Sequence, residues 1–219
     1  MSSSKNQNSP LLSHDGGGGG ASSEEPGVGG GVIGKVSAKE RILDAAAELF
    51  YAGGINSTGV DAIVARSGVA KMTLYKHFES KDLLVAAWLR RSSQLWRGNL
   101  EGSLDAISQN PREKLDHVFD VLGKWFGRAD FRGCAFINCL AELSDPAHPA
   151  RVVAAEHRKL VRAYLSRLAW EAGFKEYVML GEVLGMLADG ATVAALAERS
   201  PDAAKNAAAV AATILRSAR

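Results

Sequence analysis

Residues 60–89 read VDAIVARSGVAKMTLYKHFESKDLLVAAWL, and their apolar pattern decides the fold of the N-terminal part of the chain. The apolar residues before Gly68 recur at helical spacing, and Leu74 and Phe78 repeat that spacing directly after it. Two short helices joined by a turn of about three or four residues that contains glycine are typical of a helix-turn-helix, whose second helix lies in the major groove of DNA. The stretch therefore predicts a DNA-binding module in which residues 71–77 form the reading helix.

The outer face of residues 71–77 carries side chains of the kinds that bind DNA. Once Leu74 and Phe78 pack inward with Val69, the residues left on this face or beside it are Lys71, Met72, Thr73, Tyr75, Lys76, His77 and Lys81. Lys71 is suited to guanine or a phosphate, and Thr73 is suited to a polar base edge or a thymine methyl. The candidates for phosphate contacts are Tyr75, Lys76, His77 and Lys81. The alternatives are that His77 only packs at the helix end and that Lys81 is an ordinary solvated helix start. Residues 37–90 hold seven Lys and Arg against six Asp and Glu, so the basic character is local to this helix.

This region resembles the DNA-binding domain of the TetR family of transcriptional regulators. The resemblance covers about residues 38–90, where KERILDAAAELFYAGGINSTG precedes the stretch quoted above. It is carried by the string G-V-x-x-x-T-L-Y-x-H-F-x-S-K-x-x-L, from Gly68 to Leu84. The resemblance implies base-facing positions at Lys71, Met72 and Thr73, boundary positions at Tyr75 and Lys76, and phosphate contacts at Thr58, His77 and Lys81. Ala70 departs from the usual Ser or Thr helix cap, so we expect the reading helix to be less ordered without DNA. Met72 stands where the family commonly has Gly or another small residue, and Gly59 stands where a second Thr is frequent.

The resemblance also implies a mode of action. We expect a ligand-responsive transcriptional regulator, a repressor, that binds a palindromic double-stranded DNA operator as a homodimer and is released by a small-molecule effector. Half-sites one helical turn apart lie about 34–36 Å centre to centre, so an effector that favours another spacing of the reading heads weakens DNA binding. The alternatives are an activator, a TetR-like interaction module that has lost DNA binding, and an enzyme.

The whole body of the chain is predicted to be all-α, with about nine helices in two parts. The expected helices are 38–52, 60–67, 71–77, 81–108, 111–128, 131–144, 147–172, 175–197 and 201–218. Start signals support them, including the Ser37 and Glu40 capping box and the Asn110-Pro111 pair. The expected organisation is a disordered Gly/Ser-rich tail over 1–36, a helix-turn-helix domain over 37–84, and a helical ligand-binding and dimerisation domain over 85–219.

The last two helices are the expected dimer surface, because they are rich in small and apolar residues. Gly181 and Gly185 are four residues apart, which allows close helix approach, and packing within one chain is the alternative. An apolar lining with few polar groups suits a small-molecule pocket. The candidate lining residues on helices 111–172 are Phe119, Leu122, Trp125, Phe126, Phe136, Tyr164 and Trp170. An aromatic stripe at helical spacing is also typical of core.

Composition and motifs argue against several other classes of protein. The two cysteines cannot form a disulfide framework, and the sequence shows no apolar run of membrane-spanning length, so we expect a cytoplasmic protein without a membrane partner. Gly29, Gly34 and Lys35 have phosphate-loop spacing, but Val36 stands where Ser or Thr is required. Glu113 and His117 at i and i+4 are better explained as a solvated helix face than as metal ligands. We expect no metal, no cofactor and no enzymatic site. Cys134 is expected to be an inert buried thiol, and the minor alternative is a redox sensor whose thiol is activated by a helix N-terminus and Arg132.

Overall fold

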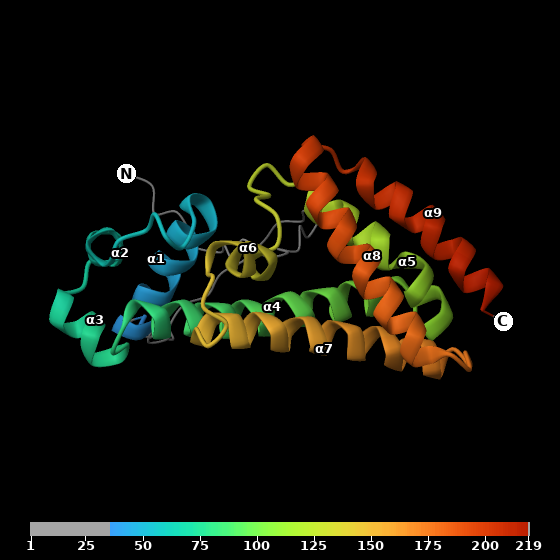
Figure 1. Cartoon of the computed structure of the whole chain (residues 1–219), viewed down its shortest axis with the longest axis horizontal. Coiled ribbons are helices and arrows are strands. Elements are labelled where there is room, and N and C mark those ends of the chain that lie inside the picture. The colour runs from blue at the N-terminus through green and yellow to red at the C-terminus, as the bar shows by residue number, and fades with distance from the viewer. Residues whose placement is uncertain (1–35, 219) are drawn as a thin grey trace, which may run out of the picture.

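The computed structural model describes residues 36–218, and within that range the fold is all-α, with nine helices joined by turns and loops and no strand (Figure 1). The helices are α1 (Ala38–Gly53), α2 (Val60–Ser67), α3 (Lys71–His77), α4 (Lys81–Ile107), α5 (Pro111–Phe126), α6 (Ala135–Glu142), α7 (Pro149–Glu171), α8 (Tyr177–Glu198) and α9 (Asp202–Ser217). The predicted fold class and helix number are confirmed. The expected tail and the phosphate-loop spacing at Gly29, Gly34 and Lys35 lie outside the described residues.

Helix boundaries follow the capping signals in the sequence. At the start of α1 the Glu40 N–H donates to Ser37 Oγ at 3.2 Å, and the Ser37 N–H donates to Glu40 Oε2 at 3.0 Å. Such a reciprocal capping box satisfies two main-chain donors that a helix N-terminus otherwise leaves unpaired. The prediction for the sixth helix began at residue 131, whereas α6 begins at Ala135. The chain turns at Gly133, where φ is +80°, so the helix cannot extend further toward the N-terminus.

The long helix α4 joins the three N-terminal helices to the rest of the bundle. Its first half packs on α1, where the Phe50 and Trp88 rings are 5.3 Å apart, and its second half packs on α5. Helix α7 runs alongside α4 for most of its length (Figure 1). Buried side chains continue from α1 to α9 without interruption. The N-terminal helices and the later helices therefore share one hydrophobic core.

Helices α7 and α8 approach each other closely because α8 carries glycine at the contact. A Cβ atom on Gly181 would lie 2.7 Å from the Ser166 nitrogen and 2.8 Å from the Arg162 carbonyl oxygen, which no side chain tolerates without movement. Arg162 also pairs with Glu182 at 2.8 Å. Gly181 and Gly185 were predicted to lie in the dimer surface, but both face α7 of the same chain. That part of the prediction is wrong, because the small residues are used for packing within the chain.

Helix α8 corrects the expectation that no apolar stretch of the chain reaches membrane-spanning length. It is the one helix within residues 36–218 that is long and apolar enough to cross a membrane by length and composition, with a mean hydropathy of 1.5 over 18 residues. One face of α8 packs on α7, α5 and α9, and Asp189 pairs with Arg158 of α7. We therefore interpret α8 as a bundle helix with a second, exposed apolar face. That face consists of Val178, Met179, Met186, Val193 and Leu196.

Candidate nucleic-acid interface

The turn between α2 and α3 is built around Gly68. Gly68 adopts the left-handed conformation, with φ 64° and ψ 30°, and its N–H donates to the Val64 carbonyl at 3.1 Å. Glycine meets this requirement without strain, because it has no Cβ. The Arg41 guanidinium of α1 donates to the Ser67 and Gly68 carbonyls at 3.4 and 3.5 Å. The turn is therefore fixed both by its own backbone and by α1.

The inner face of α3 is apolar, as the spacing predicted. Leu74 is fully buried, and Phe78 and Val69 are also buried, so one side of this short helix is fixed on α1 and α2. Ala70 is the N-cap residue and makes no side-chain cap hydrogen bond, which confirms the missing cap. Burial of Leu74 and Phe78, rather than capping, holds α3 in place.

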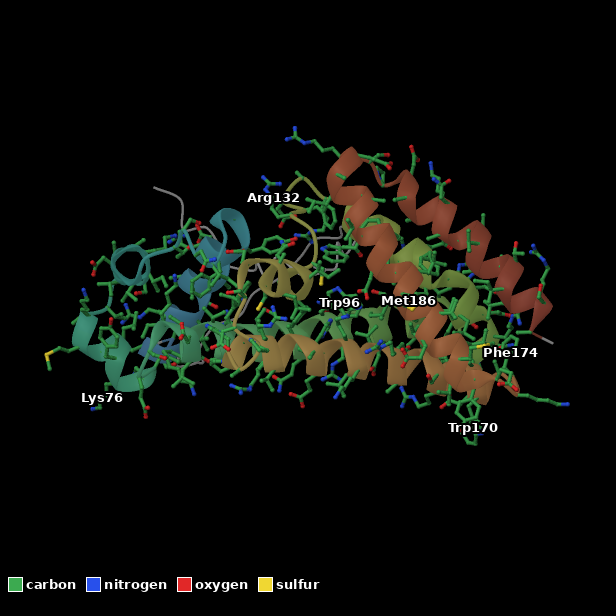
Figure 2. The ribbon with its side chains drawn as sticks, viewed as in Figure 1. Lys76, Trp96, Arg132, Trp170, Phe174 and Met186 are labelled. Carbon is green, nitrogen blue, oxygen red and sulfur yellow. The ribbon has the colours of Figure 1, made fainter. Side chains whose placement is uncertain are left out.

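Five side chains of α3 are exposed, and one of them, Lys71, is paired with Asp61 of α2. Met72 is 86% exposed and Tyr75 is 42% exposed, and Lys76 and His77 are exposed as well. Figure 2 shows Lys76 at the end of the molecule opposite Trp170 and Phe174, directed away from the rest of the chain. Thr73 is half-buried. Residues at i, i+3 and i+4 share a helix face, so Met72, Tyr75 and Lys76 form one stripe.

Lys71 differs from its neighbours because it is already paired. Its Nζ lies 2.7 Å from Asp61 Oδ1 on α2, and the hydrogen bond and charge of Asp61 raise the pKa of the Lys71 ammonium. Both side chains are solvent-exposed, so this ion pair contributes little to stability and can exchange for a phosphate or a base. Asp61 therefore orients Lys71 in the free protein.

Two predicted contact residues are placed differently from the rest. Thr58 is 7% exposed, and its hydroxyl donates to the Gly54 carbonyl at 2.7 Å, so its side chain closes the end of α1 rather than standing free for a phosphate. Lys81 is the first residue of α4, half-buried, after the Ser80 hydroxyl caps the Leu83 N–H at 3.2 Å. The structure thus brings six of the eight predicted residues together on or next to α3, namely Lys71, Met72, Thr73, Tyr75, Lys76 and His77. Lys81 lies just beyond them at the start of α4.

A polar contact between α1 and the α6 region was missed by sequence reasoning. The Tyr51 hydroxyl donates to the Gly133 carbonyl at 3.0 Å and accepts from the Arg132 N–H at 3.0 Å. The Asn56 N–H donates to Glu142 Oε2 at 3.0 Å. Partners separated by about eighty residues leave no short-range signal in a sequence. These contacts tie α1 to the chain just before α6, and the segment before α2 to the last residue of α6.

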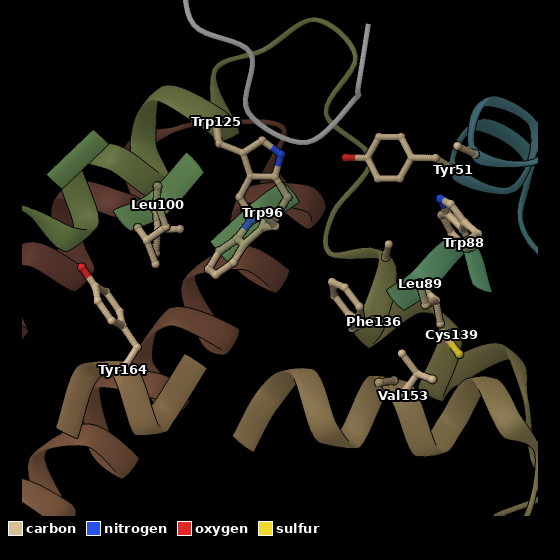
Figure 3. Close-up of a cluster of buried hydrophobic side chains, with 14 of the residues drawn as sticks. Tyr51, Trp88, Leu89, Trp96, Leu100, Trp125, Phe136, Cys139, Val153 and Tyr164 are labelled. Atoms are coloured by element: carbon tan, nitrogen blue, oxygen red, sulfur yellow. The ribbon is translucent and has the colours of Figure 1, made fainter. Parts of the chain in front are cut away.

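The candidate pocket residues are mostly core. Phe119, Leu122, Trp125, Phe126, Phe136 and Tyr164 are all buried, and Figure 3 shows several of them among the packed side chains of α4 to α7. Trp170 is 63% exposed and lines a shallow groove of about 520 Å³ between α7 and α8, with Lys159, Arg162 and Tyr177 among its neighbours. Trp170 therefore lies at the surface, apart from the other six candidates, which are buried.

A buried histidine, which the sequence did not single out, lies among these aromatic side chains. His157 stacks on Phe136 with ring centroids 3.6 Å apart, and its Nδ1 shares a hydrogen bond of 2.9 Å with Ser93 Oγ. Burial, together with the nearby charges of Arg97 and Arg158, lowers the pKa of His157 to about 3. The imidazole is therefore neutral at physiological pH and behaves as a core side chain.

The two cysteines have the properties of inert thiols. Cys134 is the N-cap residue of α6, as expected, but burial raises the pKa of its thiol to about 11. Burial also raises the pKa of Cys139 to about 11. The thiolate is the reactive form, so these shifts favour the inert thiol over the sensor at Cys134, even though the Phe136 and Ile137 N–H groups at the start of α6 act to lower its pKa.

Comparison with known proteins agrees with this geometry. Residues 42–88, which span α1 to the first part of α4, match the family model described as bacterial regulatory proteins, tetR family. The crystal structure of SCO4454, a TetR-family transcriptional regulator from Streptomyces coelicolor, is 32% identical, covers 83% of this chain and 95% of its own, and superimposes with a TM-score of 0.75. The HTH-type transcriptional regulator YxaF of Bacillus subtilis is 25% identical over 166 residues, which are 74% of this chain and 86% of that protein. The HTH-type transcriptional activator FasR of Mycolicibacterium smegmatis is 39% identical over 85 residues, 37% of this chain and 39% of that protein.

Proposed function

This chain belongs to the TetR family of DNA-binding transcriptional regulators, and from that premise we propose that it is a repressor that binds a palindromic operator as a homodimer and is released by a small-molecule effector. The single observation that carries the DNA-binding part is the outer face of α3. A short helix fixed by Leu74 and Phe78 leaves Met72, Tyr75 and Lys76 exposed together at one end of the molecule. This arrangement fits the major groove, where residues of the second helix contact base edges.

We assign the reading of bases to Lys71, Met72 and Thr73, and the contacts to phosphates to Tyr75, Lys76, His77 and Lys81. Lys71 exchanges its Asp61 partner for DNA in this proposal. Thr58 acts only by holding the segment before α2, since its hydroxyl is used within the protein. Residues 37–84 form the DNA-binding part, and residues 85–219 form the effector-binding and dimerisation part.

The exposed apolar face of α8 supports the proposed homodimer. Met186 is 60% exposed, and Val193 and Leu196 continue the same kind of surface along the helix. On α9, Val210 is also exposed. Apolar side chains gathered on adjacent helices gain free energy when a second copy covers them. Four helices, two from each copy, would then form the interface.

The contacts between α1 and α6 support a route from effector to DNA. An effector bound among α4 to α7 that displaces α6 must also move Gly133 or Glu142, which bind Tyr51 and Asn56. Near α3, His148 at the start of α7 lies 3.3 Å from Asp82 of α4. Through these links the effector changes the spacing of the two reading helices in the dimer and weakens binding to half-sites one turn apart.

Selection of bound sequences from a random duplex library by the purified full-length protein, at two salt concentrations, tests this proposal. We expect a palindrome with half-sites about one helical turn apart. Lys76→Ala should reduce the slope of log affinity against log salt concentration by about one, because one phosphate contact is lost. Lys159 is an exposed lysine on α7, and Lys159→Ala should leave this slope unchanged. In vitro transcription from a promoter carrying the palindrome then separates repression from activation. Recovery of no preferred duplex would contradict the proposed function.

A further inference from the structure

We propose that Met72 is a specificity-determining residue that reads the C5-methyl group of a thymine in each operator half-site. This inference rests on the proposed function, because it assumes that α3 lies in the major groove. It goes further by naming the chemical group that the central exposed side chain recognises.

The exposure of Met72 is the first observation. At 86% it is the most exposed large apolar side chain within residues 36–218, and it lies on the second residue of the reading helix. Such exposure contributes nothing to the fold, since an apolar side chain in water gains no burial free energy. A partner that covers the side chain would supply that gain.

The surroundings of Met72 narrow the choice of partner. Lys71 is oriented by Asp61 at 2.7 Å, and Thr73 is half-buried, so Met72 is the base-facing residue that protrudes furthest. Tyr75 and Lys76, at i+3 and i+4, lie on the same face and are suited to the flanking sugar-phosphate backbone. These neighbours place Met72 toward the bases.

The chemistry of the major groove identifies the group. The edges of base pairs there carry mainly hydrogen-bond donors and acceptors, and the thymine C5-methyl is the only methyl group among them. A thioether is a flexible, unbranched apolar side chain that neither donates nor accepts a strong hydrogen bond. Over a cytosine amino group it would remove water without replacing the lost hydrogen bond, which is unfavourable. Over thymine it buries two apolar groups against each other.

The test replaces single thymines of the selected operator by deoxyuridine, which lacks only the methyl group. Affinities of the full-length protein are measured by fluorescence anisotropy. At one thymine position of each half-site, we expect the replacement to weaken binding about fourfold, and about fifteenfold when both half-sites are changed. With Met72→Gln, a side chain of similar length, the same replacement should change affinity less than twofold.

Thr73→Ser is the matched comparison, because it removes the methyl group of the neighbouring base-facing residue. We expect it to retain the full difference between thymine and deoxyuridine. Thermal unfolding midpoints of both variants should equal that of the unmodified protein, since neither change removes a core contact. Three outcomes would overturn the assignment while leaving operator binding intact. Met72→Gln could keep the affinity difference between thymine and deoxyuridine, Thr73→Ser could lose it, or no thymine of the operator could prove sensitive to the replacement. Failure to select any duplex would overturn this proposal together with the proposed function.

Discussion

Replacing Tyr51 by Phe removes one buried oxygen atom, and we expect this change to destabilise the protein by about 2–3 kcal/mol. The hydroxyl serves two main-chain groups, the Gly133 carbonyl and the Arg132 N–H, each at 3.0 Å. Both lose their partner in the variant. Leaving one buried polar group without a hydrogen bond costs about 1–3 kcal/mol. The Arg132 N–H is only partly buried, so the combined cost for the two main-chain groups lies near the lower end of what two fully buried groups would cost.

Urea denaturation and thermal unfolding measure this effect. For a chain of this size each kcal/mol shifts the unfolding midpoint by about 2–4 °C, so we expect a decrease of about 4–12 °C. Tyr75→Phe is the matched control, because it removes the same atom from an exposed side chain and should change the free energy of unfolding by less than about 0.5 kcal/mol. If Tyr51→Phe were as stable as the control, the contact between α1 and the segment before α6 would not hold the two parts together.

Three other predictions concern the buried histidine, the helix contact and the exposed face. The pKa of His157 is about 3 in the folded protein, against 6.5 for an unperturbed histidine, so the stability that its neutral form contributes is complete above pH 6.5 and is lost as the pH falls toward 3. The free energy of unfolding measured by urea titration should therefore be about 2 kcal/mol lower at pH 5.0 than at pH 7.5, and His157→Phe should reduce this difference. Gly181→Ala should destabilise the protein by about 1–3 kcal/mol in the same assay, whereas Gly102→Ala, where a Cβ meets no atom within 4 Å, should be neutral or stabilising by up to about 1 kcal/mol. Met186→Lys should yield a monomer in sedimentation equilibrium while Val152→Lys, 58% exposed on α7, should remain dimeric; the opposite result would place the dimer interface elsewhere.

Helix positions were predictable because their determinants are local. Ser37 and Glu40 lie three residues apart, and the apolar residues of each helix follow one repeat, so both features can be read along the chain. The inner face of α3 was predictable for the same reason. The start of α6 was not, because the turn at Gly133 lies where the chain contacts Tyr51 of α1, and a contact so distant in sequence leaves no local pattern.

Sequence alone does not distinguish two uses of one side chain that depend on its position in the fold. A hydroxyl at Thr58 is equally suited to a phosphate and to a main-chain carbonyl, and only the distance of 2.7 Å to the Gly54 oxygen distinguishes them. Glycines four apart allow close approach to a helix of the same chain or of a partner, and the geometry of Gly181 selects α7. An aromatic side chain such as Trp170 fits a core as well as a surface groove.

Exposed apolar side chains mark both surfaces at which this chain is proposed to meet a partner. Folding accounts for the apolar side chains that face inward, such as Leu74 on α3 and Leu184 on α8, because both are buried within a single copy. It does not account for Met72 and Met186, which are exposed on the opposite faces of those same helices. An apolar side chain gains free energy only when another surface covers it. Met72 lies on the helix that is proposed to enter DNA, and Met186 lies on the helix that is proposed to meet a second copy. A change at Met72 should therefore alter which duplex is bound without altering assembly, and a change at Met186 should alter assembly and lower affinity for every palindrome alike.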